Sequence, residues 1–460
     1  MLASHRFRIR LPIFGMDARQ LSLIAMVVAL AFSVDAQASE YLLGYRIELL
    51  PDQGIARVGI SLGGDPKALP SRLEFTIEPG RHSAFSGTGT VRTPTEESVR
   101  WEPPNTGGRL NYEFRIDRER GSKGYDARMT ASWALFRADH LVPSVTVRAP
   151  AGAESVATVE FVLPDGWSVL TAYPEIDPLH VGQGGQDAHG RKVAQGTIDD
   201  ADRRFDRPKG WLFAGKIGSR RETIAGSDVV VAGPTGQGLR RVDTLAMLNW
   251  TLPHLAKVFP NLPPRILIVM ARDPMWRGGL SGPRSLFLHG DRPLISENRT
   301  STLLHELVHV LSGIHADHES DWIVEGMAEF YSTEILRRSG GISQERFEKT
   351  MKQLAAWGRR AKTLFVTRST AETTARGAVV FYDLDREIRE ATGGKKSLDD
   401  VARKLASTVG DVTFSRLVAL AEEAAGRPVV ALEIQKLRNR AAPVPKTTPK
   451  TVPNESGAPR

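Results

Sequence analysis

The sequence predicts an α+β protein in which an N-terminal β-sandwich-like domain is followed by a mainly helical domain. Two observations carry this prediction. From Glu40 to about Thr235 apolar and polar residues alternate with a period of two, which is the pattern of strands with one buried face. Beyond Gly236 the apolar residues recur every three or four positions instead, as they do on one face of a helix.

The strands of the first half are predicted from short alternating runs. In the run 110–116 every second residue is a Leu, Tyr, Phe or Ile, and the residues between them are polar. Similar runs occur at 56–62, 73–77 and 229–231, and Gly, Pro and Asp separate them. Many short strands with turn residues between them are typical of two packed sheets, so we expect a β-sandwich.

The second half contains one buried strand and a series of helices. The strand is predicted at 265–270, where six residues include four consecutive aliphatic ones. The expected helices cover 239–258, a segment around 303–311, 321–338 with an end at Gly340, a segment from about Ser343, and 375–390, followed by two more.

The two ends of the chain differ in composition from the domains. Residues 1–38 combine four Arg residues, an apolar run from Leu21 to Val34 and a small-residue segment at 36–38, which is the pattern of an export signal whether translation starts at Met1 or at Met16. Residues 441–460 are rich in Pro, Thr and Lys, so we expect a disordered tail. The predicted domains are therefore 39–235 and 236–440.

The composition excludes several kinds of site. The chain has 460 residues and no cysteine, which excludes disulfides, thiolate metal ligands and a cysteine nucleophile. The terminal segments carry half of the net charge of +8, and no Lys/Arg block is interleaved with aromatic residues, so we expect no nucleic-acid partner. No segment after the signal approaches about 18 uninterrupted apolar residues, so we expect no stable membrane insertion once the signal is removed.

The most informative motif is His305-Glu306-Leu307-Val308-His309. Residues four apart share one face of a helix, so both imidazoles can bind one ion, and Glu306 can act as a general base on a metal-bound water. The flanks support a helix, with Asn298 and Thr300 as candidate caps and Gly313 at the end. The alternative is a pair of structural histidines beside a core stripe, but the motif lies in the helical context that zinc binding requires.

A third ligand is needed, because a hydrolytic zinc normally takes three protein ligands and a water. Glu325 is the best candidate, in a predicted helix that Asp321 can cap. Glu329 lies four residues later on the same face, so one carboxylate can bind the metal while the other accepts the remaining N–H of a ligating histidine. Exposed helix glutamates are common, but the neighbours of these two are largely apolar.

His315 is a rival third ligand, since it stands six residues after His309, as in the longer motif with three histidines. That motif requires a Gly three residues after the second histidine, where this chain has Ser312. We therefore favour Glu325 and expect His315 and His318 on an exposed loop.

These residues resemble the gluzincin metallopeptidases, and in particular the glycyl aminopeptidase family. The resemblance rests on 305–309 and 322–331, on Gly-Gly-Leu at 278–280, and on the later segments 376–380 and 389–400. It covers about residues 210–435. It does not include the PDZ-like module into which the family pattern usually continues.

The resemblance implies a thermolysin-like catalytic domain with one Zn²⁺ held by His305, His309 and Glu325. Glu306 is then the base and proton shuttle, and Glu329 the residue that orients a ligand. The segment Gly278, Gly279, Leu280 and Ser281 matches the family's substrate-binding edge strand.

Two positions depart from the family pattern. In relatives that remove N-terminal residues, a Glu follows Gly-Gly-Leu and binds the free amino group of the substrate, whereas this chain has Ser281. Ser281 therefore favours attack on internal bonds or on substrates without a free amino terminus.

The second departure is Thr374, which replaces a Tyr that donates a hydrogen bond to the oxyanion in relatives. Tyr382 and Tyr331 are candidate replacements, and His289 is another.

The function predicted from the sequence is that of an exported zinc metallopeptidase, periplasmic or secreted, acting on peptide or protein substrates. The alternative is a non-catalytic or weakly active envelope binding protein that keeps the gluzincin fold and metal site, which the departures at Ser281 and Thr374 motivate. Against this alternative stands the complete set of His305, Glu306, His309 and Glu325, which pure binding does not require.

Overall fold

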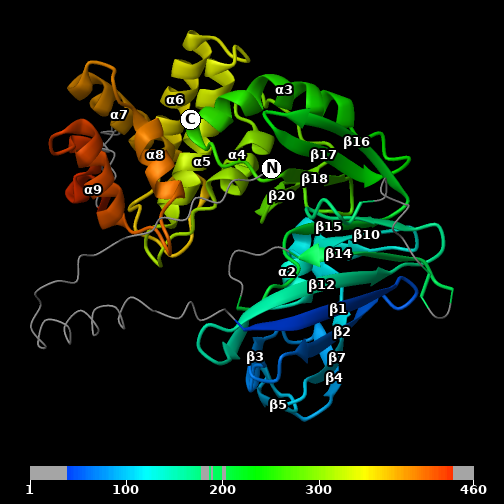
Figure 1. The fold of residues 1–460 in the computed structure, drawn as a ribbon. Helices are drawn as coiled ribbons and strands as arrows, with labels where there is room; N and C mark the ends of the chain where they lie inside the picture. The colour runs from blue at the N-terminus through cyan, green and yellow to red at the C-terminus, as the bar shows by residue number, and fades with distance from the viewer. Residues whose placement is uncertain (1–38, 178–185, 188–189, 199–203, 439–460) are drawn as a thin grey trace, which may run out of the picture.

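The computed structural model describes residues 39–177, 186–187, 190–198 and 204–438. The predicted export signal at 1–38 and the predicted tail at 441–460 lie outside these described residues. Figure 1 shows a strand-rich N-terminal part and a helical C-terminal part, as the sequence predicted. No helix of the described residues is long and apolar enough to cross a membrane.

The N-terminal part consists of three sheets. Their strands are β1 (Glu40–Leu50), β2 (Ile55–Gly64), β3 (Arg72–Thr76), β4 (His82–Gly87), β5 (Thr90–Thr95), β6 (Ser98–Glu102), β7 (Gly108–Arg115), β8 (Arg118–Glu119), β9 (Tyr125–Met129), β10 (Trp133–Arg137), β11 (Val145–Arg148), β12 (Glu154–Val162), β13 (Ser168–Leu170), β14 (Val193–Ile198) and β15 (Trp211–Gly215). The sheet orders are β14-β12-β1-β2-β7-β4, β13-β15-β10-β9-β8 and β11-β3-β6-β5. A short 3-10 turn (Gly121–Lys123) and the short helix α2 (Ala138–Leu141) join these strands.

The predicted alternation is confirmed in these sheets. In β7, Leu110, Tyr112 and Phe114 are buried and the residues between them are not. One hydrophobic core takes members from all three sheets, for example Tyr45, Phe75 and Phe136. The sandwich-like character follows from strands that each contribute one apolar face to this shared core.

A further sheet supports the helices. Its strands are β16 (Ile217–Ile224), β17 (Ser227–Pro234), β18 (Arg265–Ala271), β19 (Gly279–Gly282) and β20 (Ser285–His289), in the order β16-β17-β18-β20-β19. The predicted domain boundary at 235/236 falls between β17 and β18, which pair in parallel within this sheet. Strand β19 forms one edge and is antiparallel to β20.

The two parts of the chain share a second core. Trp211 and Phe213 of β15 pack with Leu267 of β18 and Phe287 of β20, and all four side chains are at most 1% exposed. Strand β18 is buried at every position because a sheet covers one of its faces and helices cover the other. This packing fixes the ends of β10 and β15 relative to β19.

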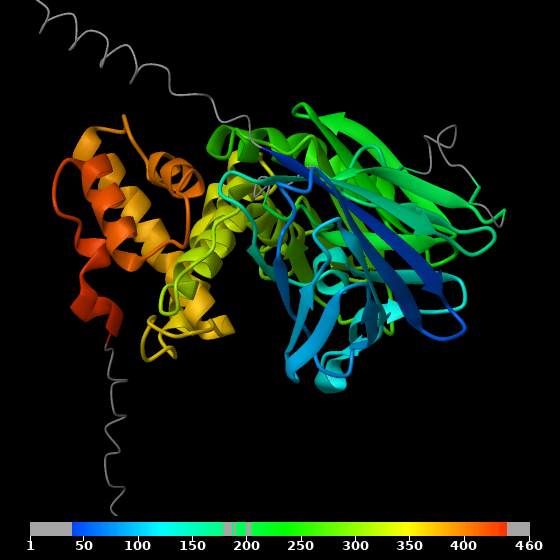
Figure 2. The ribbon, with the colours of Figure 1, turned by 60° about the horizontal axis from the view of Figure 1, so that its bottom comes forward.

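The helices follow the predicted order. They are α3 (Arg241–Val258), α4 (Thr302–Ser312), α5 (Asp321–Arg338), α6 (Gln344–Gly358), α7 (Ala371–Thr392), α8 (Leu398–Ala406), α9 (Phe414–Ala425) and α10 (Ile434–Arg438), with a 3-10 turn at Val430–Leu432. Helix α7 begins four residues before the predicted start, because Thr370 and Thr373 form a capping box there. In Figure 2 the last helices lie on the side of the molecule away from the strand-rich part.

Candidate metal centre

Helix α4 carries the motif, and local chemistry fixes both of its ends. The Ser301 side chain caps the start by accepting the Leu304 N–H at 3.3 Å. This corrects the prediction of Asn298 or Thr300 as the cap, because only Ser301 directly precedes the first helical residue. Gly313 ends the helix in the left-handed conformation with φ 58°, as predicted.

The two histidines of α4 meet a carboxylate of α5. His305 Nε2 lies 3.2 Å from His309 Nε2, and Glu325 places one oxygen 3.4 Å from the first nitrogen and the other 3.6 Å from the second. One ligand atom from each residue lies within 4.8 Å of the other two, and among the described residues these three form the one such group. The structure therefore brings together the three predicted ligands.

Glu329 contacts the far side of His305. Its Oε2 accepts the His305 Nδ1 proton at 3.1 Å, since a carboxylate has no proton to donate. With Nδ1 protonated, the neutral imidazole has its lone pair on Nε2, the nitrogen that faces His309 and Glu325. Glu325 thus faces the Nε2 atoms of both histidines, and Glu329, four residues later on the same helix face, contacts the Nδ1 atom of His305.

The charges around Glu325 favour its ionised form. Burial raises the pKa of Glu325, but the hydrogen bond and charge of His305 outweigh it and lower that pKa to about 2. Burial lowers the pKa of His305, and hydrogen bonds to Glu325 and Glu329 outweigh it and raise that pKa well above the ordinary value. The positive charge of protonated His305 therefore balances the negative charge of Glu325, and a metal ion would bind there in exchange for the proton.

The donor set fits zinc. Two imidazole nitrogens and a carboxylate converge, and this is the ligand set of catalytic zinc sites that leave a fourth position for water. The two Nε2 atoms also lie close enough together for one ion to contact both.

Glu306 lies on the same helix and is 9% exposed. Burial raises the pKa of Glu306, while the charge of His305 and hydrogen bonds from the side chain and backbone of Ser281 oppose that rise. Gly279 leaves room for this carboxylate, since a Cβ there would lie 2.7 Å from Glu306 Cγ. Both contacts come from β19, the predicted substrate strand.

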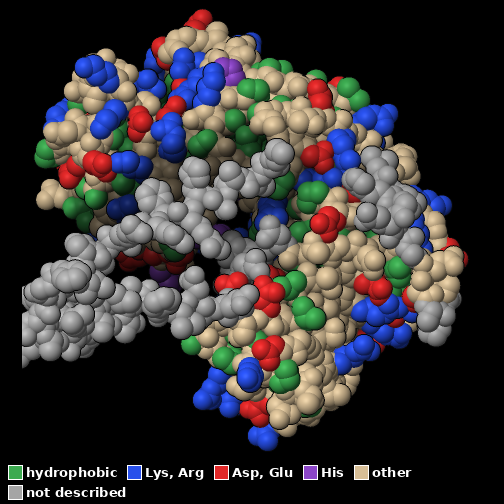
Figure 3. Space-filling model, in the orientation of Figure 1, with side chains coloured by type: hydrophobic (Ala, Val, Ile, Leu, Met, Phe, Trp, Pro, Cys, Tyr) green, Lys and Arg blue, Asp and Glu red, His purple; other side chains and the backbone are tan. Residues whose placement is uncertain are grey.

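Strand β19 is held from its other side by the N-terminal part. The Leu280 carbonyl accepts the Trp211 Nε1 proton at 2.8 Å, and the Ser281 carbonyl accepts a hydrogen bond from Arg137 at 3.2 Å. The Gly278 carbonyl accepts the His289 N–H at 2.9 Å, so His289 lies beside the residue that precedes β19. Figure 3 shows a recess between the two parts in which acidic and histidine side chains are visible.

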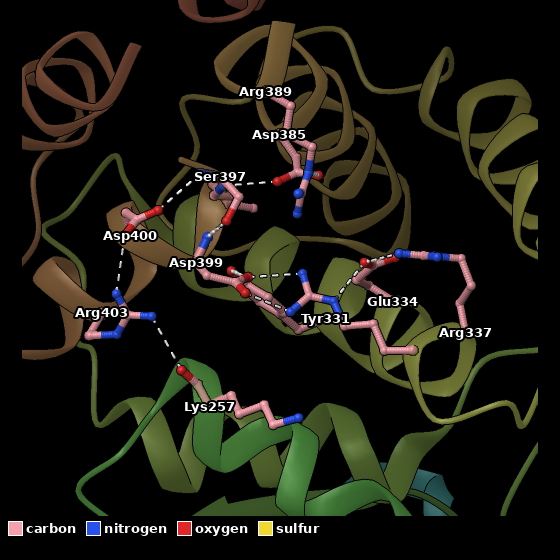
Figure 4. A network of polar contacts seen from close by, with 12 residues as sticks. Lys257, Tyr331, Glu334, Arg337, Asp385, Arg389, Ser397, Asp399, Asp400 and Arg403 are labelled. Carbon is pink, nitrogen blue, oxygen red and sulfur yellow. Dashed lines mark hydrogen bonds and ion pairs between the residues drawn. The ribbon is translucent and has the colours of Figure 1, made fainter. Parts of the chain in front are cut away.

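Tyr331, a predicted oxyanion donor, directs its hydroxyl toward α8. Its hydroxyl donates to Asp399 Oδ1 at 2.9 Å, and Arg338 binds the same carboxylate at 2.7 and 2.9 Å. Figure 4 shows this network between α5 and α8, which Glu334 and Arg337 extend. The fully buried hydroxyl thus has a partner in the helical core, and its role as an oxyanion donor stays a prediction.

The other candidate donors, Tyr382 and His289, and the position Thr374, where relatives have the donor Tyr, lie in different surroundings. The Tyr382 ring packs against Phe347 of α6 at 5.7 Å between centroids. Thr374 lies in the first turn of α7, where its N–H bonds to the Thr370 carbonyl. His289 is fully buried, and its Nε2 lies 3.5 Å from Asp273. None of these contacts joins the three residues to Glu306.

His315, the rival ligand, is exposed on the loop after α4 and lies outside the group of converging ligands. Its backbone carbonyl accepts the Val412 N–H at 2.7 Å, which ties the loop to the segment before α9. The structure thus agrees with the expectation of a loop histidine.

Two cations near the site were missed in the sequence. Arg137 contacts Ser281 from a strand that is 144 residues away in the chain, and Arg368, on the exposed loop before α7, lowers the pKa of Glu325 through its charge. No motif marks either residue, because each reaches the site only through tertiary packing.

Comparisons with known proteins place this fold. No protein-family profile matches the chain, and no curated protein matches it in sequence. Among solved structures, an aminopeptidase N family protein from Idiomarina loihiensis aligns with TM-score 0.60 and 14% identity, over 79% of this chain and 70% of that one. A two-domain M1 zinc metallopeptidase variant bound to L-tryptophan aligns with TM-score 0.56 and 18% identity, over 89% and 95% of the two chains.

The M1 zinc metallopeptidase from Deinococcus radiodurans aligns with TM-score 0.55 and 18% identity, over 92% of this chain and 96% of that one. These proteins share the layout of a strand-rich N-terminal part followed by a helical part. The chain therefore has the fold of the M1 zinc metallopeptidases, with a gluzincin-type His–His–Glu site in its helical part.

Proposed function

We propose that this protein is a zinc metallopeptidase that hydrolyses peptide bonds with Glu306 as the general base. The observation that carries the proposal is the convergence of His305, His309 and Glu325 beside a buried carboxylate on the same helix. The fold supports it, since proteins named as M1 zinc metallopeptidases align with nearly the whole described chain.

His305, His309 and Glu325 would hold the ion. When bound, zinc supplies Lewis-acid chemistry, polarising a carbonyl and lowering the pKa of water. Glu329 keeps the Nδ1 proton on His305, so that Nε2 stays available as a ligand.

Glu306 takes a proton from the attacking water and delivers it to the leaving amine. Its carboxylate is held for this task by Ser281, which donates to it from the side chain and the backbone. Burial raises the pKa of Glu306, and a higher pKa makes the carboxylate a stronger base for a proton transfer near neutral pH.

We also propose that the protein acts outside the cytoplasm, in the periplasm or after secretion. The basic and apolar pattern of residues 1–38 supports export. A cell-fractionation experiment with an epitope-tagged full-length chain tests this proposal, and a tag confined to the cytoplasm contradicts it.

The test of the activity is a peptide library incubated with three preparations of the same protein. These are the purified form, a form stripped with a chelator, and the stripped form reloaded with one equivalent of zinc. Cleavage that is lost on stripping and restored by zinc supports the proposal. A zinc-loaded preparation that cleaves no peptide, although metal analysis gives one ion per chain, contradicts it.

A further inference from the structure

The open edge of β19 offers hydrogen-bonding groups to an extended peptide. The His289 N–H bonds to the Gly278 carbonyl, so residues 278 and 289 form a hydrogen-bonded pair. Because such pairs alternate in antiparallel sheets, the backbone groups of Gly279 and Ser281 point away from β20. A peptide can therefore add to this edge beside Glu306, as in other cases of strand addition.

At Ser281 the outward backbone groups of this edge already have hydrogen-bond partners within the protein. Its carbonyl accepts the Arg137 Nη1 proton at 3.2 Å, and its N–H donates to Glu306. The outward backbone groups of Gly279 can still pair with a peptide. A peptide that extends beyond Ser281 would contact Arg137 and the N-terminal part. Trp211 of the N-terminal part also donates to the neighbouring Leu280 carbonyl and is buried in the core that the two parts share.

Arg137 is fixed in place by Asp139. Its Nε donates to Asp139 Oδ1 at 3.1 Å and its Nη2 to Asp139 Oδ2 at 2.5 Å. Asp139 also accepts the Gly210 N–H at 3.0 Å, and its side chain is 12% exposed. The guanidinium is thus held by both of its partners, and its orientation is set before any substrate binds.

The contacts described above use only part of the guanidinium. Of its five N–H donors, Asp139 accepts two and Ser281 accepts one. The remaining two have no acceptor among the residues that the structure describes, and 27% of the side chain is exposed. Two free N–H groups of a planar guanidinium match a carboxylate or a carbonyl oxygen. An ammonium group has only donors and finds no partner there.

We propose that Arg137 is a specificity-determining residue that binds a substrate carboxylate or acyl oxygen next to the scissile bond and disfavours a free amino group there. The proposal rests on the proposed peptidase function and names its substrate class: peptides with an acidic residue or an acylated end at the Ser281 end of β19. An acidic side chain and an acyl group share one feature, an oxygen atom that accepts hydrogen bonds from the two remaining N–H groups of Arg137.

The test uses the full-length zinc-loaded protein and matched fluorogenic peptides. One set differs only at the amino terminus, which is free, acetylated or succinylated. A second set, with acetylated ends, carries Glu, Gln or Lys beside the scissile bond. We expect acceptor-bearing peptides to exceed their cationic counterparts in kcat/KM by about ten- to hundredfold, which is the range of a charge-assisted hydrogen bond.

The Arg137→Gln variant should reduce this preference to about twofold or less, mainly by raising KM for the acceptor-bearing peptides. Arg137→Lys keeps the positive charge but loses the planar pair of N–H donors, so it should retain part of the preference for acceptor-bearing peptides. The control is Arg57→Gln, which removes a charge from a half-exposed surface ion pair with Glu113 and should leave the preference unchanged. Where Arg137→Gln loses zinc or thermal stability, Arg137→Lys carries the comparison.

A binding experiment separates this inference from the peptidase proposal. Calorimetric titration with N-methylated, cleavage-resistant versions of the succinylated and free-amine peptides should give tighter binding of the former, and Arg137→Gln should remove the difference. Such binding without cleavage of any peptide contradicts the peptidase function and supports the role of Arg137. Cleavage with the same preference in wild type and Arg137→Gln, or a strict requirement for a free amine, overturns the inference and leaves the peptidase function standing.

Discussion

Gly326 of α5 and Gly377 of α7 lie back to back where the two helices cross. A Cβ at Gly326 would stand 2.7 Å from the Cα and carbonyl carbon of Gly377. Both positions are buried, and the three atoms nearest to a Cβ at Gly326 are backbone atoms that cannot rotate away. This close approach fixes the helix that carries Glu325, the residue next to Gly326.

Gly326→Ala should therefore destabilise the protein although alanine is the better helix former. The gain in helix propensity is about 1 kcal/mol, and the cost of forcing two packed helices apart is about 1–3 kcal/mol, with weaker zinc binding as a consequence. Urea unfolding and a zinc titration measure the two effects. The control is Gly63→Ala in β2, where a Cβ meets nothing within 4 Å. Equal stability of the two variants contradicts the argument.

Glu306→Gln should abolish peptide cleavage and keep the zinc. The amide has nearly the same shape but cannot take a proton from water, and loss of a general base costs about 10²–10⁴-fold in rate. Cleavage assays and metal analysis on the same sample measure this. Full activity in the variant would falsify the mechanism.

Glu329→Ala should weaken zinc binding by about 10–100-fold, because His305 loses the acceptor that keeps its proton on Nδ1. Competition with a chromophoric chelator gives the affinity. Glu329→Gln keeps an oxygen acceptor and should recover part of the loss. Glu348→Ala removes a glutamate from the exposed hydrogen bond with Gln344 on α6 and serves as the control. An affinity of Glu329→Ala equal to that of this control counts against the assigned role.

Gly279→Ala should lower kcat by about tenfold or more while zinc binding is retained. The new Cβ would lie 2.7 Å from Glu306 Cγ and from Thr302 Cγ2, so the Glu306 carboxylate must shift. If Glu306 is the general base, a displacement near 1 Å can cost about a hundredfold in rate. Steady-state kinetics and metal content test this together. An unchanged kcat shows that Glu306 does not work from the position seen here.

Asp139→Asn should make stability less dependent on pH. Burial raises the pKa of Asp139, but the Arg137 guanidinium outweighs it and holds that pKa below the ordinary value. A carboxyl whose folded pKa is lowered contributes stability above its unfolded pKa, about 3.9, and loses it as the pH falls through the folded value.

The variant should accordingly be less stable than wild type by about 1–3 kcal/mol at pH 7, which is the range for a hydrogen bond to a charged group. The difference should shrink below about pH 4, as protonation removes the same charge from wild type. Urea unfolding across pH 3–7 measures it. A difference that stays constant over this range shows that the charge of Asp139 contributes nothing.

Local rules let the sequence determine several features by itself. The bounds of α5 at Asp321–Arg338 agree with the prediction, and so do the alternating burial of β7 and the left-handed Gly313 at the end of α4. The metal residues belong to the same class, since His305 and His309 share a helix face through their spacing alone. Each of these features depends on residues fewer than about ten positions apart.

Only the tertiary structure decided the rest. It placed Tyr331 against Asp399, brought Ser281 to Glu306 and added Arg137 to the Ser281 carbonyl. It also paired β17 with β18 across the predicted boundary. These relationships depend on how apolar faces far apart in the chain pack together, and residue spacing carries no information about such distances. The sequence thus specified the chemistry of the metal centre, and packing between the two parts of the chain decided what surrounds it.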